Sequence, residues 1–153
     1  MLKVGIFSFA GCEGCVVEFV ELLNDHQDWL KKIDFKYAKI LKKSEDFTGL
    51  DVAFIEGAIV SEADVERIKK IRDNCKKLVC IGTCATMGQP AGQRNFFNDD
   101  LKKEVQFLVD RFHQLPKVLS VKEVVKVDAE VQGCPMNDDA FVKVLNGLLE
   151  EFK

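Results

Sequence analysis

The chain has 153 residues, 47% of them hydrophobic, which is enough to bury a full-sized core in one domain. Its formal net charge of −3 comes from 22 basic and 25 acidic residues without a basic block or stripe, so nucleic acid is not an expected partner. No apolar run approaches the roughly 18 residues of a spanning helix, and the opening MLKVGIF does not resemble a signal peptide. We therefore expect one cytoplasmic domain over residues 1–153, with no transmembrane segment.

The first half of the chain alternates strand and helix patterns. Residues 2–7 form a short apolar run of strand type, and apolar residues at helical spacing follow over 16–23. Residues 35–40 and 51–56 predict a second and a third strand. Ser61 precedes acidic residues of a first helical turn, where free amides and the helix dipole favour negative charge, so it predicts a helix start.

The second half continues the alternation. Residues 78–82 predict a fourth strand, and residues 83–95 (TCATMGQPAGQRN) predict a long irregular segment. A helix is expected over about 98–112, a strand with one buried face over 122–131, and an amphipathic helix from 138 or 139 to the C-terminus. The apolar positions of the first of these helices are Leu101, Val105, Leu108 and Phe112.

This order of elements predicts the fold class. Strands that alternate with helices favour a mostly parallel sheet with helices on both faces, an α/β domain of three layers. In such sheets, sites form at the carboxyl ends of the strands.

Four of the six cysteines each lie just past the end of a predicted strand. They are Cys12 and Cys15 in GCEGC, Cys84 in IGTCA and Cys134 in QGCP. Because the carboxyl ends of parallel strands meet at one edge, their sulfurs are expected to converge. Four thiolates are what a [4Fe-4S] cluster requires.

Two features of GCEGC suit an inorganic group. Gly11 and Gly14 are expected to let the backbone approach it closely and to adopt positive φ angles. The free amides at the start of the following helix would stabilise thiolate and sulfide charge.

Two other readings of the cysteines stay open. Cys12 and Cys15 also match a dithiol that exchanges disulfides, although such an enzyme has no use for Cys84 and Cys134. Structural zinc is the second alternative, but it normally takes paired cysteines from short knuckles. The remaining two thiols, Cys75 and Cys80, are expected to behave as small hydrophobic side chains.

Three segments resemble the small subunit of nickel-iron hydrogenases: GCEGCVVEF, FIEGAIVSEADVERIKKIRDNCKKLVCIGTCATMG and VDAEVQGCPMNDDAFV. The likeness covers nearly the whole chain. It implies a flavodoxin-like fold in which Cys12, Cys15, Cys84 and Cys134 hold one [4Fe-4S] cluster beside a large subunit that carries the nickel-iron centre. The chain would be the electron relay of a hydrogenase, without catalytic residues of its own, and would pass electrons to a further flavin or iron-sulfur subunit.

The 20 kDa electron-transfer subunit of respiratory complex I is similar too. Its first motif has adjacent cysteines, whereas Glu13 and Gly14 separate them here, so the resemblance favours a hydrogenase of the cytoplasmic kind, including NAD-reducing types. A quinone-linked complex I-like subunit and a stand-alone dithiol or cluster-carrier module remain alternatives. Many members of the hydrogenase family have an acidic residue at the position of Gly11 and a second, cluster-rich domain.

Four polar residues near the cysteines are further candidates. Glu56 in IEGAI is expected either near a subunit interface or as a solvated strand end. Glu13 should turn away from an anionic cluster, toward solvent, a base or a partner. Thr83 and Thr86 are candidate hydrogen-bond donors to the sulfurs.

The loop after Cys84 carries candidate contacts to a partner. Arg94 and Asn95 are expected to dock on the large subunit or, alternatively, to lie in solvent. Phe9, Phe96 and Phe97 fall in loops near the cysteines, where they would cover the cluster, face a partner or anchor their loops in the core.

Overall fold

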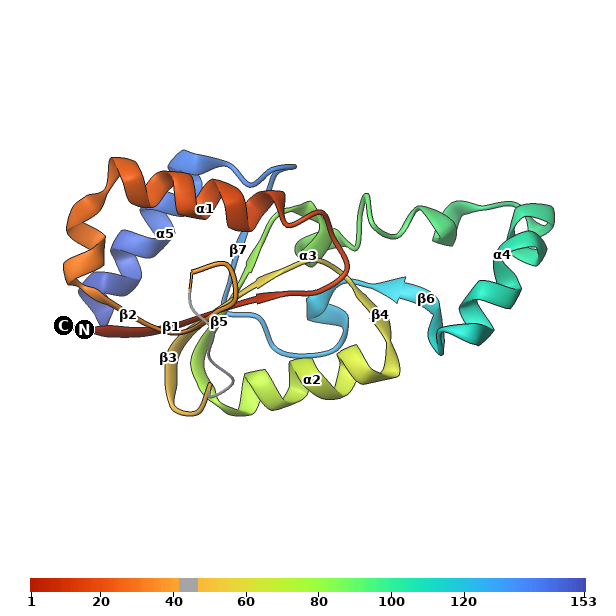
Figure 1. The fold of residues 1–153 in the computed structure, drawn as a ribbon, viewed down its shortest axis with the longest axis horizontal. Coiled ribbons are helices and arrows are strands. Elements are labelled where there is room, and N and C mark those ends of the chain that lie inside the picture. The colour runs from red at the N-terminus through yellow and green to blue at the C-terminus, as the bar shows by residue number, and fades with distance from the viewer. Residues whose placement is uncertain (42–46) are drawn as a thin grey trace.

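A five-stranded parallel sheet runs through the centre of the protein (Figure 1). The computed structural model describes residues 1–41 and 47–153. The strands of this sheet are β1 (Leu2–Ser8), β2 (Ile33–Ala38), β3 (Leu50–Glu56), β5 (Cys75–Ile81) and β7 (Ala129–Val131), in the order β2-β1-β3-β5-β7. Numbered along the chain, this is the 2-1-3-4-5 order of flavodoxin-like folds. The predicted α/β fold of three layers is therefore confirmed.

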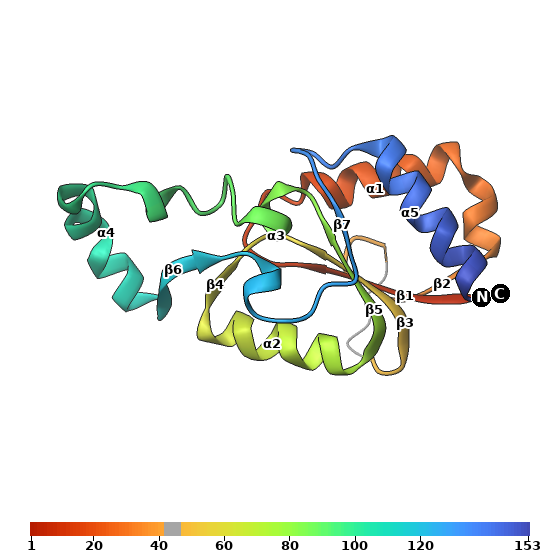
Figure 2. The ribbon, with the colours of Figure 1, turned by 180° about the vertical axis from the view of Figure 1, so that it is seen from behind.

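Helices cover both faces of the sheet (Figures 1 and 2). Helices α1 (Gly14–Asp25) and α5 (Asp138–Glu151) lie on one face. Helix α2 (Glu62–Asp73) covers the other, where the short α3 (Thr83–Met87) adds Ala85 to the core. Two short 3-10 helices, η1 (Gln27–Lys31) and η3 (Val121–Glu123), lie in the connections.

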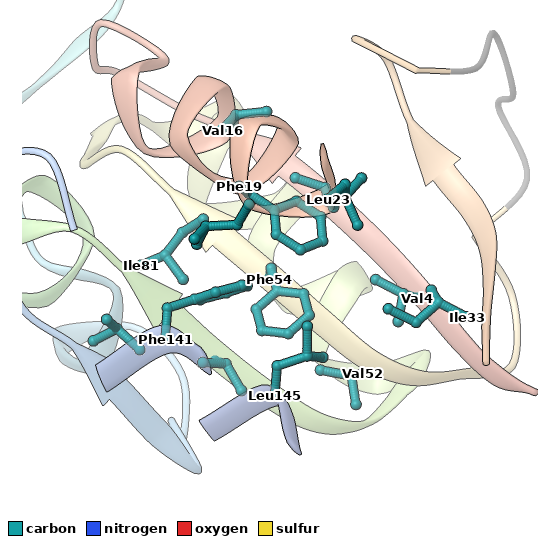
Figure 3. Close-up of a cluster of buried hydrophobic side chains, with 14 of the residues drawn as sticks. Val4, Val16, Phe19, Leu23, Ile33, Val52, Phe54, Ile81, Phe141 and Leu145 are labelled. Atoms are coloured by element: carbon teal, nitrogen blue, oxygen red, sulfur yellow. The ribbon is translucent and has the colours of Figure 1, made fainter. Parts of the chain in front are cut away.

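The two faces bury two separate cores because strand side chains alternate. In β3, Val52 and Phe54 point toward α1 and α5, whereas Ala53 and Ile55 point toward α2. Aromatic rings fill the centre of the first core: the Phe141 ring centroid lies 5.0 Å from that of Phe19 and 5.4 Å from that of Phe54 (Figure 3). Cys80 is buried in the second core, as expected of a structural thiol.

The helix starts follow from the sequence. Ser61 accepts a hydrogen bond from the amide of Asp64, and the Asp64 carboxylate accepts one from the Ser61 amide, so that both ends of a capping box are present. Asn137 is the N-cap of α5, and its side chain accepts a hydrogen bond from the Ala140 amide. These contacts satisfy amides that otherwise have no partner at a helix start.

An arm projects from the carboxyl end of the sheet between β5 and β7 (Figures 1 and 2). It contains η2 (Gln93–Phe96), α4 (Asp99–Arg111) and β6 (Gln114–Leu119), and β6 pairs with β4 (Ile59–Ser61) in a separate antiparallel ribbon. Helix α4 forms where predicted, capped by Asn98, but its apolar stripe does not enter the core. Leu101, Leu108 and Phe112 are all exposed, and Val109 is the buried residue of this helix.

Two predictions about this half of the chain were wrong. Residues 83–95 are not irregular throughout, since they contain α3 and η2. Residues 122–131 form a strand only at their end. The Asp128 carboxylate accepts a hydrogen bond from the Leu78 amide at 2.8 Å, and this side-chain contact ends the backbone pairing between β5 and β7 at that point. The valines before it anchor a connecting segment on the second core. Strand β6, which contains Pro116, was not predicted.

Within the residues that the structure describes, no helix combines the length and the apolar character needed to cross a bilayer.

We predict that Phe141→Ala lowers the free energy of unfolding by about 3–5 kcal/mol, because it removes a fully buried ring from the centre of the first core. Phe107→Ala is the matched control: this ring is 62% exposed on α4, and its loss should change stability by less than about 0.5 kcal/mol. Urea unfolding followed by circular dichroism measures both. Equal effects of the two substitutions would contradict the assignment of the core.

Candidate functional site

The four candidate cysteines line one pocket of about 380 Å³. Cys12 comes from the turn between β1 and α1, Cys15 from the first turn of α1, Cys84 from the start of α3, and Cys134 from the turn between β7 and α5. Cys15 is buried, Cys84 is half-buried, and Cys12 and Cys134 are exposed. Three segments that are distant in sequence thus present their thiols to a common volume with one side open to solvent.

Backbone contacts between two of these loops set the shape of the pocket. The Gly82 amide donates to the Val131 carbonyl, and the Thr83 amide donates to the Gly133 carbonyl, each at 2.8 Å. Thr83 Oγ1 in turn accepts a hydrogen bond from the Gly133 amide at 3.3 Å. The loop of Cys84 is therefore tied to the loop of Cys134.

Gly82 is required by the position of Cys15. Its φ of 82° is disfavoured for other residues, and a Cβ at this position would lie 2.3 Å from Cys15 Sγ. Any side chain here would push the Cys15 sulfur away from the pocket.

The cysteine thiols lie in acidic and partly apolar surroundings. Among the described residues, the pocket lining includes Glu18, Glu21 and Glu56 and no basic side chain. Burial raises the pKa of the Cys15 thiol to about 11 and also raises the pKa of Cys84. These two groups are protonated thiols at neutral pH until a cation replaces the proton.

The four cysteines share the lining of one volume. Within residues 1–41 and 47–153, they and the other candidate ligands form no ready-made group of three around a single point. Four thiolates are the ligand set that a [4Fe-4S] cluster requires.

Glu56, at the end of β3, lies in this pocket and is not a solvated strand end. It is 2% exposed, and its Oε2 has no hydrogen-bond partner among the described residues. Burial raises the pKa of this carboxyl from 4.5 to about 7, against the opposing effect of a hydrogen bond from the Glu13 amide. A Cβ on Gly11 would lie 2.7 Å from Glu56 Oε1, so Gly11 makes room for this carboxyl.

The backbone of GCEGC differs from the expectation. Gly11 and Gly14 do not adopt positive φ angles, and Glu13 does, with φ 61° at the N-cap of α1. The side chain of Glu13 is exposed and lines a different cavity, away from the sulfurs. This agrees with the expectation that it turns away from them.

The two threonines differ in placement. Thr83 lines the cysteine pocket, as expected of a donor near the sulfurs. Thr86 does not: its single hydroxyl proton is directed to Gln132 Oε1 at 2.8 Å and shared with the Gly82 carbonyl oxygen at 3.2 Å. The expectation that Thr86 donates to a sulfur was wrong.

The candidate contact residues in the loops also differ in placement. Arg94 donates to the carbonyls of Leu115 and Pro116, and the Asn95 side chain pairs with the backbone of Val118 at 2.8 Å in both directions. Both residues therefore hold the arm together and are not free in solvent. Of the three candidate phenylalanines, Phe96 is exposed, whereas Phe9 and Phe97 are half-buried.

Sequence reasoning missed Glu18 and Glu21 in the pocket lining. They lie four and seven residues after Gly14 on α1, so helical periodicity starting from that glycine of the GCEGC motif would have indicated both.

A family model described as NADH ubiquinone oxidoreductase, 20 Kd subunit, matches residues 12–148, a range that includes all four pocket cysteines. Two curated relatives belong to hydrogenases. One is part of the F420-non-reducing hydrogenase of Methanothermobacter marburgensis and is 29% identical over 165 residues, covering 97% of this chain and 54% of the relative. The other is the delta subunit of the NAD-reducing hydrogenase HoxS of Cupriavidus necator, which is 28% identical over 164 residues, covering 97% of this chain and 78% of the relative. The chain thus spans about half the length of the first relative.

Solved structures share the fold. A chain in the crystal structure of an NAD+-reducing NiFe-hydrogenase in the H2-reduced state superposes with a TM-score of 0.84 at 24% identity, covering 98% of this chain and 92% of that one. A chain of the reduced Ni-Fe-Se hydrogenase from Desulfomicrobium baculatum gives a TM-score of 0.64 at 20% identity, covering 94% and 60%.

We predict that Glu56 makes the stability of the cluster-free protein depend on pH. Because its folded pKa is raised to about 7 from 4.5, its contribution is fully present below pH 4.5 and is lost as pH rises through 7. Between pH 5 and 8 the wild type should lose about 2–3 kcal/mol relative to Glu56→Gln in urea unfolding under reducing conditions. The control is Glu21→Gln, at an exposed carboxyl of the same pocket, whose free energy of unfolding should vary with pH as that of the wild type does. Identical pH profiles of wild type and Glu56→Gln would exclude the raised pKa of Glu56.

Proposed function

Because this chain belongs to the NADH ubiquinone oxidoreductase 20 Kd subunit family, we propose that it is the electron-transfer subunit of a nickel-iron hydrogenase complex. In this proposal Cys12, Cys15, Cys84 and Cys134 bind one [4Fe-4S] cluster. The observation that carries it is the convergence of these four thiols, from three separate segments of the chain, on one pocket. The names of the curated relatives support the hydrogenase assignment.

The residues of the chain have distinct tasks in this proposal. When bound, the cluster supplies one-electron transfer. The buried Cys15 and half-buried Cys84 hold it from the protein side, while the exposed Cys12 and Cys134 lie toward the open side. That open side leaves room for a partner subunit to approach the cluster closely. The acidic lining around the thiols favours the oxidised, less negative form and so lowers the reduction potential.

The partners follow from the same assignment. A large subunit with the nickel-iron centre would lie over the open side of the cysteine pocket and split hydrogen, and a flavin or iron-sulfur subunit would exchange electrons with this one. The complex would be cytoplasmic, since its relatives include subunits of NAD-reducing and F420-non-reducing hydrogenases.

The geometry argues against disulfide exchange by Cys12 and Cys15. Burial raises the pKa of the Cys15 thiol to about 11, so Cys15 itself does not supply an attacking thiolate at neutral pH. Two further thiols line the same pocket and would have no task in a dithiol enzyme. A complex I-like subunit remains the second candidate, because the matching family model carries that description.

We predict that the protein purified without oxygen, or reconstituted with iron and sulfide, binds about four irons per chain. Single Cys84→Ala and Cys134→Ala substitutions should reduce bound iron and the visible absorption of the cluster severalfold, because each removes one of four ligands. Cys75→Ala is the matched control, since this half-buried thiol lies at the far end of β5 and does not line the pocket. Unchanged iron in Cys84→Ala and Cys134→Ala would contradict the ligand assignment.

The hydrogenase assignment has its own test. We expect the tagged chain, isolated from its native cells, to bring with it a larger subunit that contains nickel, identified by mass spectrometry and metal analysis. Addition of hydrogen should then reduce the cluster, as seen by electron paramagnetic resonance. A partner without nickel, together with reduction by quinol or NADH but not by hydrogen, would favour the complex I-like alternative.

A further inference from the structure

A second cavity, of about 350 Å³, lies beside the cysteine pocket at the carboxyl ends of β1 and β2. The GCEGC turn separates the two. Glu13 and Val16 line the second cavity, while Cys12, Gly14 and Cys15 line the cysteine pocket. A partner subunit that covers the cysteine pocket would therefore also lie next to this cavity.

Arg67 of α2 reaches into the cavity and is held there by neutral groups. Its Nη1 donates to the Ser8 carbonyl at 3.1 Å, and its Nη2 lies 3.5 Å from Tyr37 Oη. The guanidinium carbon lies 4.8 Å from the centroid of the Phe9 ring. Tyr37 is itself fixed by stacking on Phe7, with the ring centroids 4.5 Å apart. The half-buried guanidinium is thus positioned in advance, with further N–H donors to spare.

The two cations of this cavity have no carboxylate partner among the residues that the structure describes. Across the described part of the chain, neither Arg67 nor Lys39 forms an ion pair with a carboxylate. Arg72 of the same helix, in contrast, lies 2.6 Å from Asp128. Glu13 is the acidic residue of the cavity lining, against two basic ones. A half-buried arginine that has no ion pair within residues 1–41 and 47–153, with a lysine in the same cavity lining, is a donor set suited to oxyanions.

We propose that this cavity is a carboxylate-binding site, with Arg67 as the main ligand and Lys39 and the Tyr37 hydroxyl as supporting donors. The carboxylate has two possible sources: a small free carboxylic acid, or an acidic side chain of the subunit that covers the cysteine pocket. The second source rests on the proposed function, and the first does not. Glu13 opposes an anion in the cavity and therefore limits the affinity.

The first experiment needs no partner and uses the full chain loaded with its cluster. Succinate is titrated at low ionic strength by isothermal calorimetry, and saturable binding with a Kd in the millimolar range is expected. Arg67→Gln should weaken it about tenfold, as for loss of a charged hydrogen bond, and Lys39→Gln about threefold. Glu13→Gln should tighten it about threefold, because a repulsive charge is removed.

The control is Arg111→Gln, which removes an exposed arginine that also stacks on a phenylalanine, 5.9 Å from the Phe112 ring. It should bind succinate like the wild type. Iron content and circular dichroism check the fold of each variant; if Arg67→Gln does not fold, Lys39→Gln and Glu13→Gln carry the test, since both side chains are exposed. Absence of saturable binding, or equal losses in Arg67→Gln and Arg111→Gln, overturns the site.

The second experiment identifies the source of the carboxylate in the assembled complex. If a partner side chain occupies the cavity, Arg67→Gln should raise the Kd of the partner about tenfold, and succinate should compete with the partner. If the ligand is a free acid, the partner should bind both proteins equally while succinate still binds the wild type. If the chain proved not to belong to a hydrogenase, the succinate binding measured in the first experiment would still stand.

Discussion

Parallel strand pairing is the constraint on which the rest of this protein depends. Because β1, β3, β5 and β7 run in the same direction, the turns that follow β1, β5 and β7 meet at one edge of the sheet. Hydrogen bonds from Gly82 and Thr83 to the carbonyls of Val131 and Gly133 then fix two of these turns to each other. The two aromatic and aliphatic cores hold the sheet in place beneath them, so the cysteine pocket rests on rigid strands even though its cysteines lie in turns and first helical turns.

Charge is distributed unevenly along this edge. The cysteine pocket has an acidic lining that includes Glu56, whereas the neighbouring cavity contains Arg67 and Lys39. The short GCEGC turn is the wall between them, and its Glu13, held at φ 61°, contributes its amide to Glu56 and its side chain to the other cavity. A substitution in this turn therefore affects both the cysteine pocket and the neighbouring cavity.

Much of the fold could be read from local patterns. The apolar runs of β1 and β3, the capping box at Ser61 and the start of α5 after Asn137 all lie within a residue or two of their predicted positions. The failures have a common cause, since tertiary contacts override local pattern there. Val124, Val125 and Val127 pack on the second core as a connection, and Asp128 limits β7 to three residues. The stripe of α4 is amphipathic but lies on a projecting arm.

The sequence by itself determined the fold class, the strand ends and the four cysteines that follow them, because hydrophobic periodicity and turn residues are local properties. Only the tertiary structure decided that Glu56 is buried, that Thr86 faces Gln132, and that Arg67 and Lys39 share a cavity in which neither has an ion pair among the described residues. Burial and charge neutralisation depend on neighbours that are distant along the chain. Those neighbours are known only once the loops have been brought together at the edge of the sheet.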